Sequence, residues 1–268
     1  MANNWEYVYN GLTVGGATPY GITLVDGFSD MADIRADISD KVGRHGGFTF
    51  MDRYGVRRVV LQGDMTAATQ AAFEGQVTSL KTAFAAQANP LPLVFKRPGL
   101  GGSGQHRLYC KPSKLAIPFT TDFAIGYSPW AAELVAEDPF FYDDTATTPT
   151  ITGATGGTAS MTNSGNVPLL FENVRVTGPG TTFTIRINAD PNNAVVIAHT
   201  LGAGAYIDVD FQDRTVVDNT GTSQYGKVTQ ASTKWWELPV GTTTVQFIVG
   251  SGGSAATNAA FTFRNAWN

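Results

Sequence analysis

The sequence predicts a mainly β protein built from two domains. Gly is frequent, with 30 in 268 residues, and Thr, Ala, Asn and Val recur in short alternating runs, a pattern typical of many short strands joined by tight turns. Residues 1–143 carry 12 basic and 14 acidic side chains, whereas residues 144–268 carry only 6 and 8. We therefore expect a domain boundary near residues 143–150, where "DDTATTPT" has the composition of a linker.

The first domain, residues 1–143, is predicted to contain strands before and after one helix. "WEYVYNGLTV" and "VRRVVLQGDM" alternate as strands do, and "NG" at positions 10 and 11 marks a turn. Across residues 66–87 the period changes to that of an amphipathic helix. Its apolar face would consist of Phe73, Val77, Leu80 and Phe84. Asp64 or Thr66 is expected to cap the start, and "NP" at positions 89 and 90 to stop it.

The second domain, residues 144–268, shows no helical period. Its strand-like segments, which include "TFTIRINAD", "AYIDVDF" and "TTVQFIVG", follow one another at short intervals. This spacing favours an antiparallel β-sandwich.

Composition argues against several classes of function. The net charge of −4 lacks the basic excess of a protein that binds phosphate backbones. No apolar run has the length of a membrane span, so we expect no membrane insertion. The single cysteine, Cys110, allows no internal disulfide and is expected to be a small strand residue.

The sequence contains no motif for catalysis, a metal or a cofactor. His45, His106 and His199 lie in separate segments, without the spacing of a metal site. The loop "PGLGGSGQ" lacks the Lys and hydroxyl of a phosphate-binding loop. Asp208 and Asp210 share one strand face and are expected at a solvent-facing edge, since a glycosidase needs two carboxylates across a cleft. We therefore expect no enzymatic activity.

A charged segment is the first candidate for an interface. Its members are Asp30, Asp33, Asp37, Arg44, Arg53, Arg57 and Arg58. It is either a solvated loop or a charge-complementary contact between copies of the protein. The long connection at residues 96–107 is a second candidate for contacts.

Two aromatic groups have other predicted roles. In "AELVAEDPFFYDD" we interpret Pro139, Phe140, Phe141 and Tyr142 as a packed joint that holds the two domains at a fixed angle. Trp235 and Trp236 are adjacent, so in a strand they would point to opposite faces. They are expected in the core or at an interface, with stacking on a glycan as the alternative.

The order of these segments resembles the distal tail proteins of long, non-contractile-tailed bacteriophages. The resemblance rests on "LVDGFSDMADIR", on "VVLQGDM" leading into a helix, and on "WAAELVAEDPFFYD" at the end of the first domain. In the second domain it rests on "NSGNVPLLFENVRVTG", "AYIDVDFQDRTVVD" and "KWWELPVGTTTVQF". It covers nearly the whole chain, although Val240 stands where the family often has a second Pro.

The resemblance implies a tail-tube-related, β-barrel-like first domain with one helix, and a galectin-like sandwich as the second domain. It implies a structural virion protein at the distal end of the phage tail, assembled in the host cytoplasm as a ring, expected to be a hexamer. Expected partners are the tail tube protein, the tail-tip or baseplate hub, the tape measure protein and receptor-binding or fibre proteins, with DNA only in passage. The alternative is a glycan-binding adhesion module of the tail tip.

Overall fold

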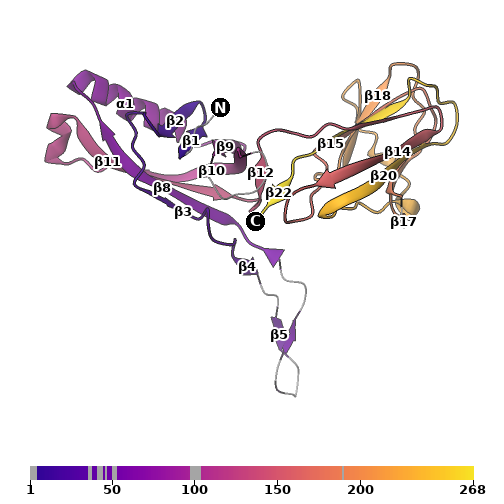
Figure 1. Cartoon of the computed structure of the whole chain (residues 1–268), viewed down its shortest axis with the longest axis horizontal. Helices are drawn as coiled ribbons and strands as arrows, with labels where there is room; N and C mark the ends of the chain where they lie inside the picture. Colours follow the sequence, from indigo (N-terminus) through magenta and orange to yellow (C-terminus); the bar gives the residue numbers. More distant parts are fainter. Residues whose placement is uncertain are drawn as a thin grey trace. The chain divides into compact units, whose positions relative to one another are not determined.

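The chain folds into two compact units. The computed structural model describes residues 5–35, 38–40, 45, 47–49, 53–96, 104–188 and 190–268 (Figure 1). The N-terminal unit comprises Met1–Asp144 with Asn268, and the C-terminal unit comprises Thr145–Trp267. Antiparallel strands are the dominant regular structure of both units, with one α-helix among the described residues, which confirms the predicted mainly β class.

The N-terminal unit is organised around one antiparallel sheet. In spatial order its strands are β2 (Leu12–Gly15), β1 (Glu6–Tyr9), β9 (Leu91–Phe95), β10 (His106–Ala116), β11 (Tyr127–Ala136), β8 (Arg57–Thr66) and β3 (Leu24–Asp26). A short strand, β12 (Phe141–Asp143), also pairs with β10. The 3-10 helix η1 (Thr121–Ile125) lies in the loop between β10 and β11.

Backbone hydrogen bonds hold the segment that leads from β2 to β3. The amide of Gly15 at the end of β2 donates to the carbonyl of Tyr20 at 2.7 Å, and the amide of Gly21 donates to the carbonyl of Asp64 in β8, also at 2.7 Å. Within the described residues no ladder joins β2 to β3, so closure of this sheet into a barrel stays an expectation.

Strands β8 and β11 form the longest ladder among the described residues of the unit. Burial alternates along both strands, with Val59, Leu61 and Met65 of β8 facing the core. Trp130 and Leu134 of β11 are buried as well. This is the two-residue period that an amphipathic strand imposes.

The helix is shorter than the predicted range of 66–87. Helix α1 spans Gln70–Ala83 and is the single α-helix of the described residues; its buried face includes Phe73 and Leu80. The predicted caps were wrong, because Asp64 and Thr66 still belong to β8. Thr69 caps the helix instead: its Oγ1 accepts a hydrogen bond from the amide of Ala72 at 3.2 Å. No helix among the described residues has the length and hydropathy needed to cross a membrane.

Loss of this cap gives a measurable prediction. Thr69→Ala is expected to lower the free energy of unfolding by about 1 kcal/mol, because one amide of the first turn loses its acceptor. Urea denaturation followed by circular dichroism would measure the change. Thr78→Ala is the matched control on the exposed face of α1, and an equal loss in both variants would show that Thr69 has no special role.

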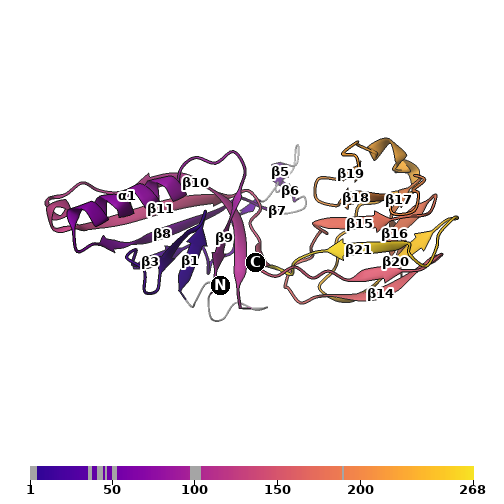
Figure 2. The ribbon, with the colours of Figure 1, turned by 90° about the horizontal axis from the view of Figure 1, so that it is seen from above.

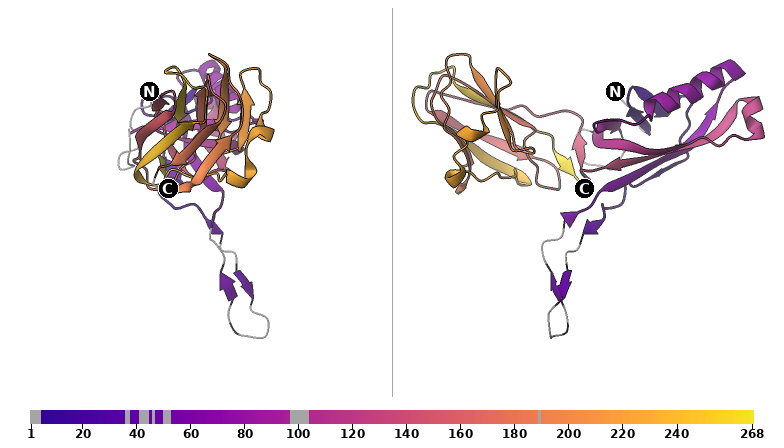
Figure 3. Two further views of the ribbon diagram at one scale, coloured as in Figure 1. Left: turned by 90° about the vertical axis from the view of Figure 1, so that its right-hand side faces the viewer. Right: turned by 180° about the vertical axis from the view of Figure 1, so that it is seen from behind.

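Two small ribbons follow β3. Strand β4 (Ile34–Arg35) pairs with β7 (Arg53–Tyr54), and β5 (Ile38–Asp40) pairs with β6 (Gly47–Thr49). Figure 3 shows both ribbons projecting away from the main sheet of the unit.

The C-terminal unit is a sandwich of two antiparallel sheets (Figure 2). One sheet contains β13 (Thr150–Thr152), β21 (Asn258–Thr262), β15 (Asn173–Thr177), β18 (Tyr206–Asp210) and β19 (Thr215–Asp218). The other contains β14 (Gly156–Asn163), β20 (Gly241–Val249), β16 (Phe183–Ile187) and β17 (Asp190–Ile197). The remaining elements are η2 (Tyr225–Lys227), η3 (Gln230–Ser232) and β22 (Ala266–Trp267).

The core of the sandwich is centred on Phe171, which is fully buried. Its ring contacts four other aromatic rings with centroids 5.2 to 5.7 Å apart, those of Phe211, Trp236, Phe261 and Phe263. Edge-to-face contacts of this kind add to the free energy gained from burial alone.

Candidate functional site

The predicted charged segment contains exposed and buried members. Asp30, Asp33, Arg53 and Arg58 are exposed, so a role in contacts between copies remains a prediction for them. Arg58 already has a partner within the chain, because its Nη1 lies 2.7 Å from Oε1 of Glu133. The predicted contacts Asp37 and Arg44, and residues 97–103 of the long connection, lie outside the described residues.

The prediction for Arg57 needs correction, because this side chain is only 3% exposed. Its Nε donates to the carbonyl of Pro139 at 2.6 Å, and its Nη1 donates to the carbonyls of Gly27 at 2.8 Å and Asp30 at 2.6 Å. Its Nη2 donates to Oδ1 of Asn268 at 3.0 Å. Burial lowers the pKa of Arg57, and the charge of Asp30 counteracts this. Arg57 is therefore a buried residue that links several backbone segments by hydrogen bonds, and it is not a surface charge.

Strand alternation explains this difference between neighbours. Arg57 and Arg58 are adjacent in β8, so their side chains point to opposite faces. Arg57 shares the buried face with Val59 and Leu61. The period of the strand was thus the signal that could have separated the two arginines in the sequence.

Phe141 of the predicted joint belongs to the core of the N-terminal unit. Its ring stacks on Phe28 with centroids 5.6 Å apart and meets Phe95 edge to face at 5.5 Å. The guanidinium carbon of Arg57 lies 4.4 Å from the centroid of the Phe141 ring. Burial, stacking and a cation contact together fix this side chain.

The other joint residues also have partners in the N-terminal unit. Pro139 is buried, and Phe140 meets Tyr54 edge to face with centroids 5.5 Å apart. The hydroxyl of Tyr142 donates to the carboxylate of Asp138, whose pKa is raised by burial. That these residues hold the two units at a fixed angle stays a prediction.

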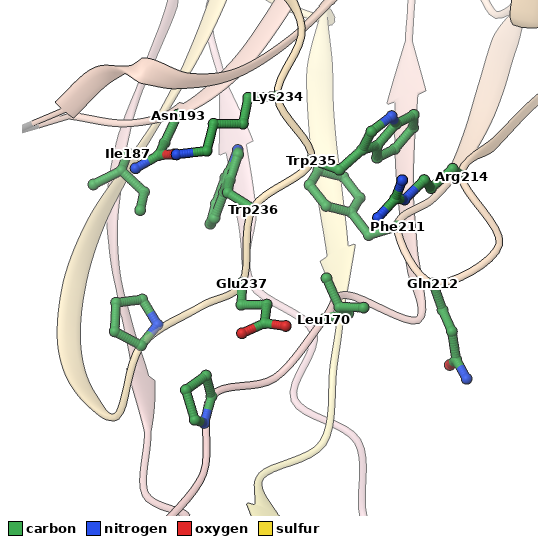
Figure 4. A pocket seen from close by; sticks show the side chains of 12 residues that line it. Leu170, Ile187, Asn193, Phe211, Gln212, Arg214, Lys234, Trp235, Trp236 and Glu237 are labelled. Carbon is green, nitrogen blue, oxygen red and sulfur yellow. The ribbon is translucent and has the colours of Figure 1, made fainter. Parts of the chain in front are cut away.

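The two tryptophans line a groove of about 440 Å³ in the C-terminal unit (Figure 4). Trp236 is only 4% exposed, and its Nε1 donates to the carbonyl of Ile185 at 3.4 Å. Trp235 is half-buried and packs edge to face on Phe211, with centroids 5.3 Å apart. Trp236 is therefore a core residue, whereas Trp235 presents part of its ring to the groove.

The groove is lined by both polar and apolar side chains. Its lining is completed by Pro168, Leu170, Ile187, Asn193, Gln212, Arg214, Lys234, Glu237 and Pro239. Figure 4 shows Trp235 beside Phe211 and Arg214, with Glu237 near Leu170. A partly exposed indole bordered by amide and charged groups has the chemistry of a sugar-binding surface. Stacking of Trp235 on a glycan therefore stays an alternative prediction.

The paired carboxylates of β18 have structural partners. Asp208 accepts hydrogen bonds from Arg175 at 2.8 Å and from Asn173 at 3.0 Å, and Arg175 is the main cause that lowers its pKa. Oδ1 of Asp210 accepts from the amide of Asp213 at 2.8 Å. A carboxylate held in its ionised form is unsuited to act as a general acid.

Of the remaining candidates for chemistry, Cys110 and His106 are buried, whereas His45 is exposed and His199 is partly exposed. Burial raises the pKa of the Cys110 thiol to about 12, which suppresses its nucleophilic form. His106 is fully buried, with Nε2 3.6 Å from Oδ1 of Asp143 and its ring 5.9 Å from that of Phe95. In the part of the chain that the structure describes, no three His, Cys, Asp or Glu side chains are grouped to hold a metal ion.

Comparison with known proteins confirms the predicted resemblance. Residues 164–267 match the family of siphovirus-type tail components, over its C-terminal domain. No curated protein matches the chain in sequence.

Solved structures share the fold of the whole chain. The crystal structure of the Dit protein of phage SPP1, described as a paradigm of the hub adsorption apparatus in phages that infect Gram-positive bacteria, has a TM-score of 0.69 and 13% identity, over 97% of this chain and 98% of that chain. A chain of the phage P2 baseplate in its activated conformation with Ca has a TM-score of 0.51 and 7% identity, over 90% and 89%. The corresponding baseplate structure with Sr has a TM-score of 0.50 and 8% identity, over 91% of this chain and 90% of that chain.

Proposed function

We propose that this protein is a structural component of a phage virion, the distal tail hub that joins the tail tube to the tail tip or baseplate. The observation that carries the proposal is the shared fold with the SPP1 hub protein, which extends over 97% of this chain and 98% of that one. The match of residues 164–267 to the tail-component family supports it independently, because it rests on sequence rather than on shape.

In this proposal the N-terminal unit closes a ring, taken to be a hexamer, around a central channel. The C-terminal sandwich is the attachment platform for receptor-binding or fibre proteins. The tail tube protein, the tail-tip hub and the tape measure protein are the other partners. A net charge of −4 suits a channel through which DNA passes without binding, since the lumen would not attract phosphates.

Labelling of intact virions tests the location. Antibodies raised against the purified C-terminal unit, residues 145–267, are expected to bind at the distal end of the tail in electron micrographs. Antibodies against the major tail tube protein are the control. Labelling along the shaft, or absence of the protein from purified virions, would contradict the proposal.

A glycan-binding module is the second candidate function, favoured by the half-buried Trp235 in the groove of about 440 Å³. It predicts that Trp235→Ala lowers binding to a glycan array at least about tenfold, since stacking on an aromatic ring contributes much of such affinity. Trp5→Ala, which removes an exposed tryptophan outside the groove, is the matched control. Trp236→Ala is unsuitable because that side chain is in the core. A hub without sugar affinity would show no binding in any of the proteins.

A further inference from the structure

The N-terminal unit exposes two groups of large apolar side chains. One group lies in the loop of residues 118–126 between β10 and β11, called here the tip loop, where Phe119 is 84% and Ile125 is 77% exposed. The other includes Met31 at 61% and Ile34 at 55%, next to the β4–β7 ribbon. Several large apolar side chains exposed in one segment suggest a contact site more than single exposed residues do.

The tip loop is held in place rather than free. The ring of Phe123 meets that of Phe73 in helix α1 edge to face, with centroids 4.8 Å apart. At the end of the loop, the amide of Ala67 donates to the carbonyl of Gly126 at 2.9 Å. These contacts anchor the loop while Phe119 and Ile125 point away from the unit's core.

The ribbon of β4 and β7, called here the arginine ribbon, has an unfavourable pair at its surface. Ile34 is opposite Tyr54, and Arg35 is directly opposite Arg53. Both arginines are exposed, and among the described residues neither forms an ion pair. Like charges directly opposite one another destabilise an antiparallel pair, and a lone two-stranded ribbon is marginal in water. An acidic, partly apolar partner would relieve this repulsion and cover the exposed side chain of Ile34.

The tip loop has this chemistry. Asp122 is its single charged residue and lies between the exposed Phe119 and Ile125. A carboxylate placed between two arginines would relieve their repulsion, and the apolar side chains would cover Ile34. Charge and apolar surface thus match between the loop and the ribbon.

The two surfaces cannot meet within one copy because they lie at opposite ends of the long ladder. Tyr127, which follows the tip loop, pairs with Thr66 at one end of the β8–β11 ladder. Arg57, which follows the arginine ribbon, pairs with Ala136 at the other end. Ten residues of strand separate the ends by about 30 Å at roughly 3.3 Å per residue. Figure 1 shows this ladder running between helix α1 and β4.

We propose that the tip loop of one copy binds the arginine ribbon of the next copy. The two surfaces differ, so the contact is heterologous and propagates from copy to copy, as closure of a ring requires. This inference rests on the proposed ring and names the surfaces that close it. If the experiments below show no contact between copies, the arginine pair would instead bind an inorganic anion or a different acidic protein.

Charge exchange tests the contact in the full-length protein. Asp122→Arg alone, and Arg35→Asp with Arg53→Asp, are each expected to weaken self-association at least about tenfold, because each places like charges together. The variant that carries all three changes is expected to regain most of it. Lys81→Glu, which reverses an exposed charge on α1, is the control and should assemble normally. Native mass spectrometry and sedimentation over a concentration series would measure assembly, with circular dichroism to verify folding.

A mixing experiment tests the direction of the contact. A loop variant (Phe119→Ser and Ile125→Ser) and a ribbon variant (Ile34→Ser, Arg35→Asp and Arg53→Asp) are each expected to stay monomeric. Mixed together they should form a heterodimer and no larger species, because one intact loop and one intact ribbon remain.

Three outcomes would overturn the inference. Folded loop and ribbon variants that assemble like the unmodified protein would show that the ring closes through other surfaces, while the proposed function would stand. If the folded variant with all three charge changes does not regain self-association, the arginine pair would be assigned to another anion. An unmodified protein that remains monomeric at every concentration would overturn both the contact and the isolated ring, and virion labelling would then decide the proposed location.

Discussion

Arg57→Ala is expected to lower the free energy of unfolding of the N-terminal unit by about 3–5 kcal/mol, one of the largest single effects in the chain. The guanidinium supplies the donors for the carbonyls of Pro139, Gly27 and Asp30 and for Oδ1 of Asn268. Its removal leaves these acceptors without that donor and opens a cavity beside Phe141. Calorimetry and urea denaturation would measure the loss.

The neighbouring arginine is the matched control for this prediction. Arg58→Ala removes the same side chain from an exposed site, where its ion pair with Glu133 is screened by water, so its cost should stay below about 1 kcal/mol. Arg57→Lys keeps the charge but cannot form all four hydrogen bonds, and its stability should lie between the unmodified protein and Arg57→Ala. Equal costs at both positions would contradict the internal role of Arg57.

Phe171→Ala is expected to destabilise the C-terminal unit by about 3–5 kcal/mol, the range for loss of a large buried aromatic side chain. The fully buried ring sits among those of Phe211, Trp236, Phe261 and Phe263, so truncation leaves a cavity bordered by these four rings. The shift of the unfolding midpoint, followed by circular dichroism in urea, measures the change.

Two further variants define the expected series. Phe171→Leu keeps most of the apolar volume and should cost less than the alanine variant. Tyr225→Ala, at an exposed position of the same unit, should change stability by no more than about 0.5 kcal/mol. A Phe171→Ala protein that unfolds with the same midpoint as Tyr225→Ala would show that the cluster does not support the sandwich.

The sequence predicts the strands well because alternation reports burial directly. In β8 and β11, every buried position falls at the two-residue period of the pattern. The helix start was misplaced because residues 66–69 fit both a strand end and a first helical turn. Pairing of β8 with β11 extends to Thr66 and keeps this residue in the strand. This pairing is a tertiary contact that the local sequence does not show.

The candidate sites were harder to predict because they depend on contacts distant in sequence. The strand period could place Arg57 on the buried face, but its partner Asn268 is 211 positions away and no local pattern could reveal that contact. The sequence predicts opposite faces for Trp235 and Trp236 in a strand, but both lie outside the strands, where Trp236 is buried in the core and Trp235 is half-buried at the groove. Arg35 and Arg53 are 18 positions apart, and only the register of the ribbon shows that they face each other.

The mass of the native assembly tests the central claim most directly. Purified full-length protein, measured by native mass spectrometry and imaged by electron microscopy, is expected to form one closed oligomer with a central opening, six times the 28.5 kDa chain mass if the ring is a hexamer. A protein that stays at 28.5 kDa up to high concentration, alone and when mixed with the tail tube protein, would contradict the proposal of a ring-forming hub.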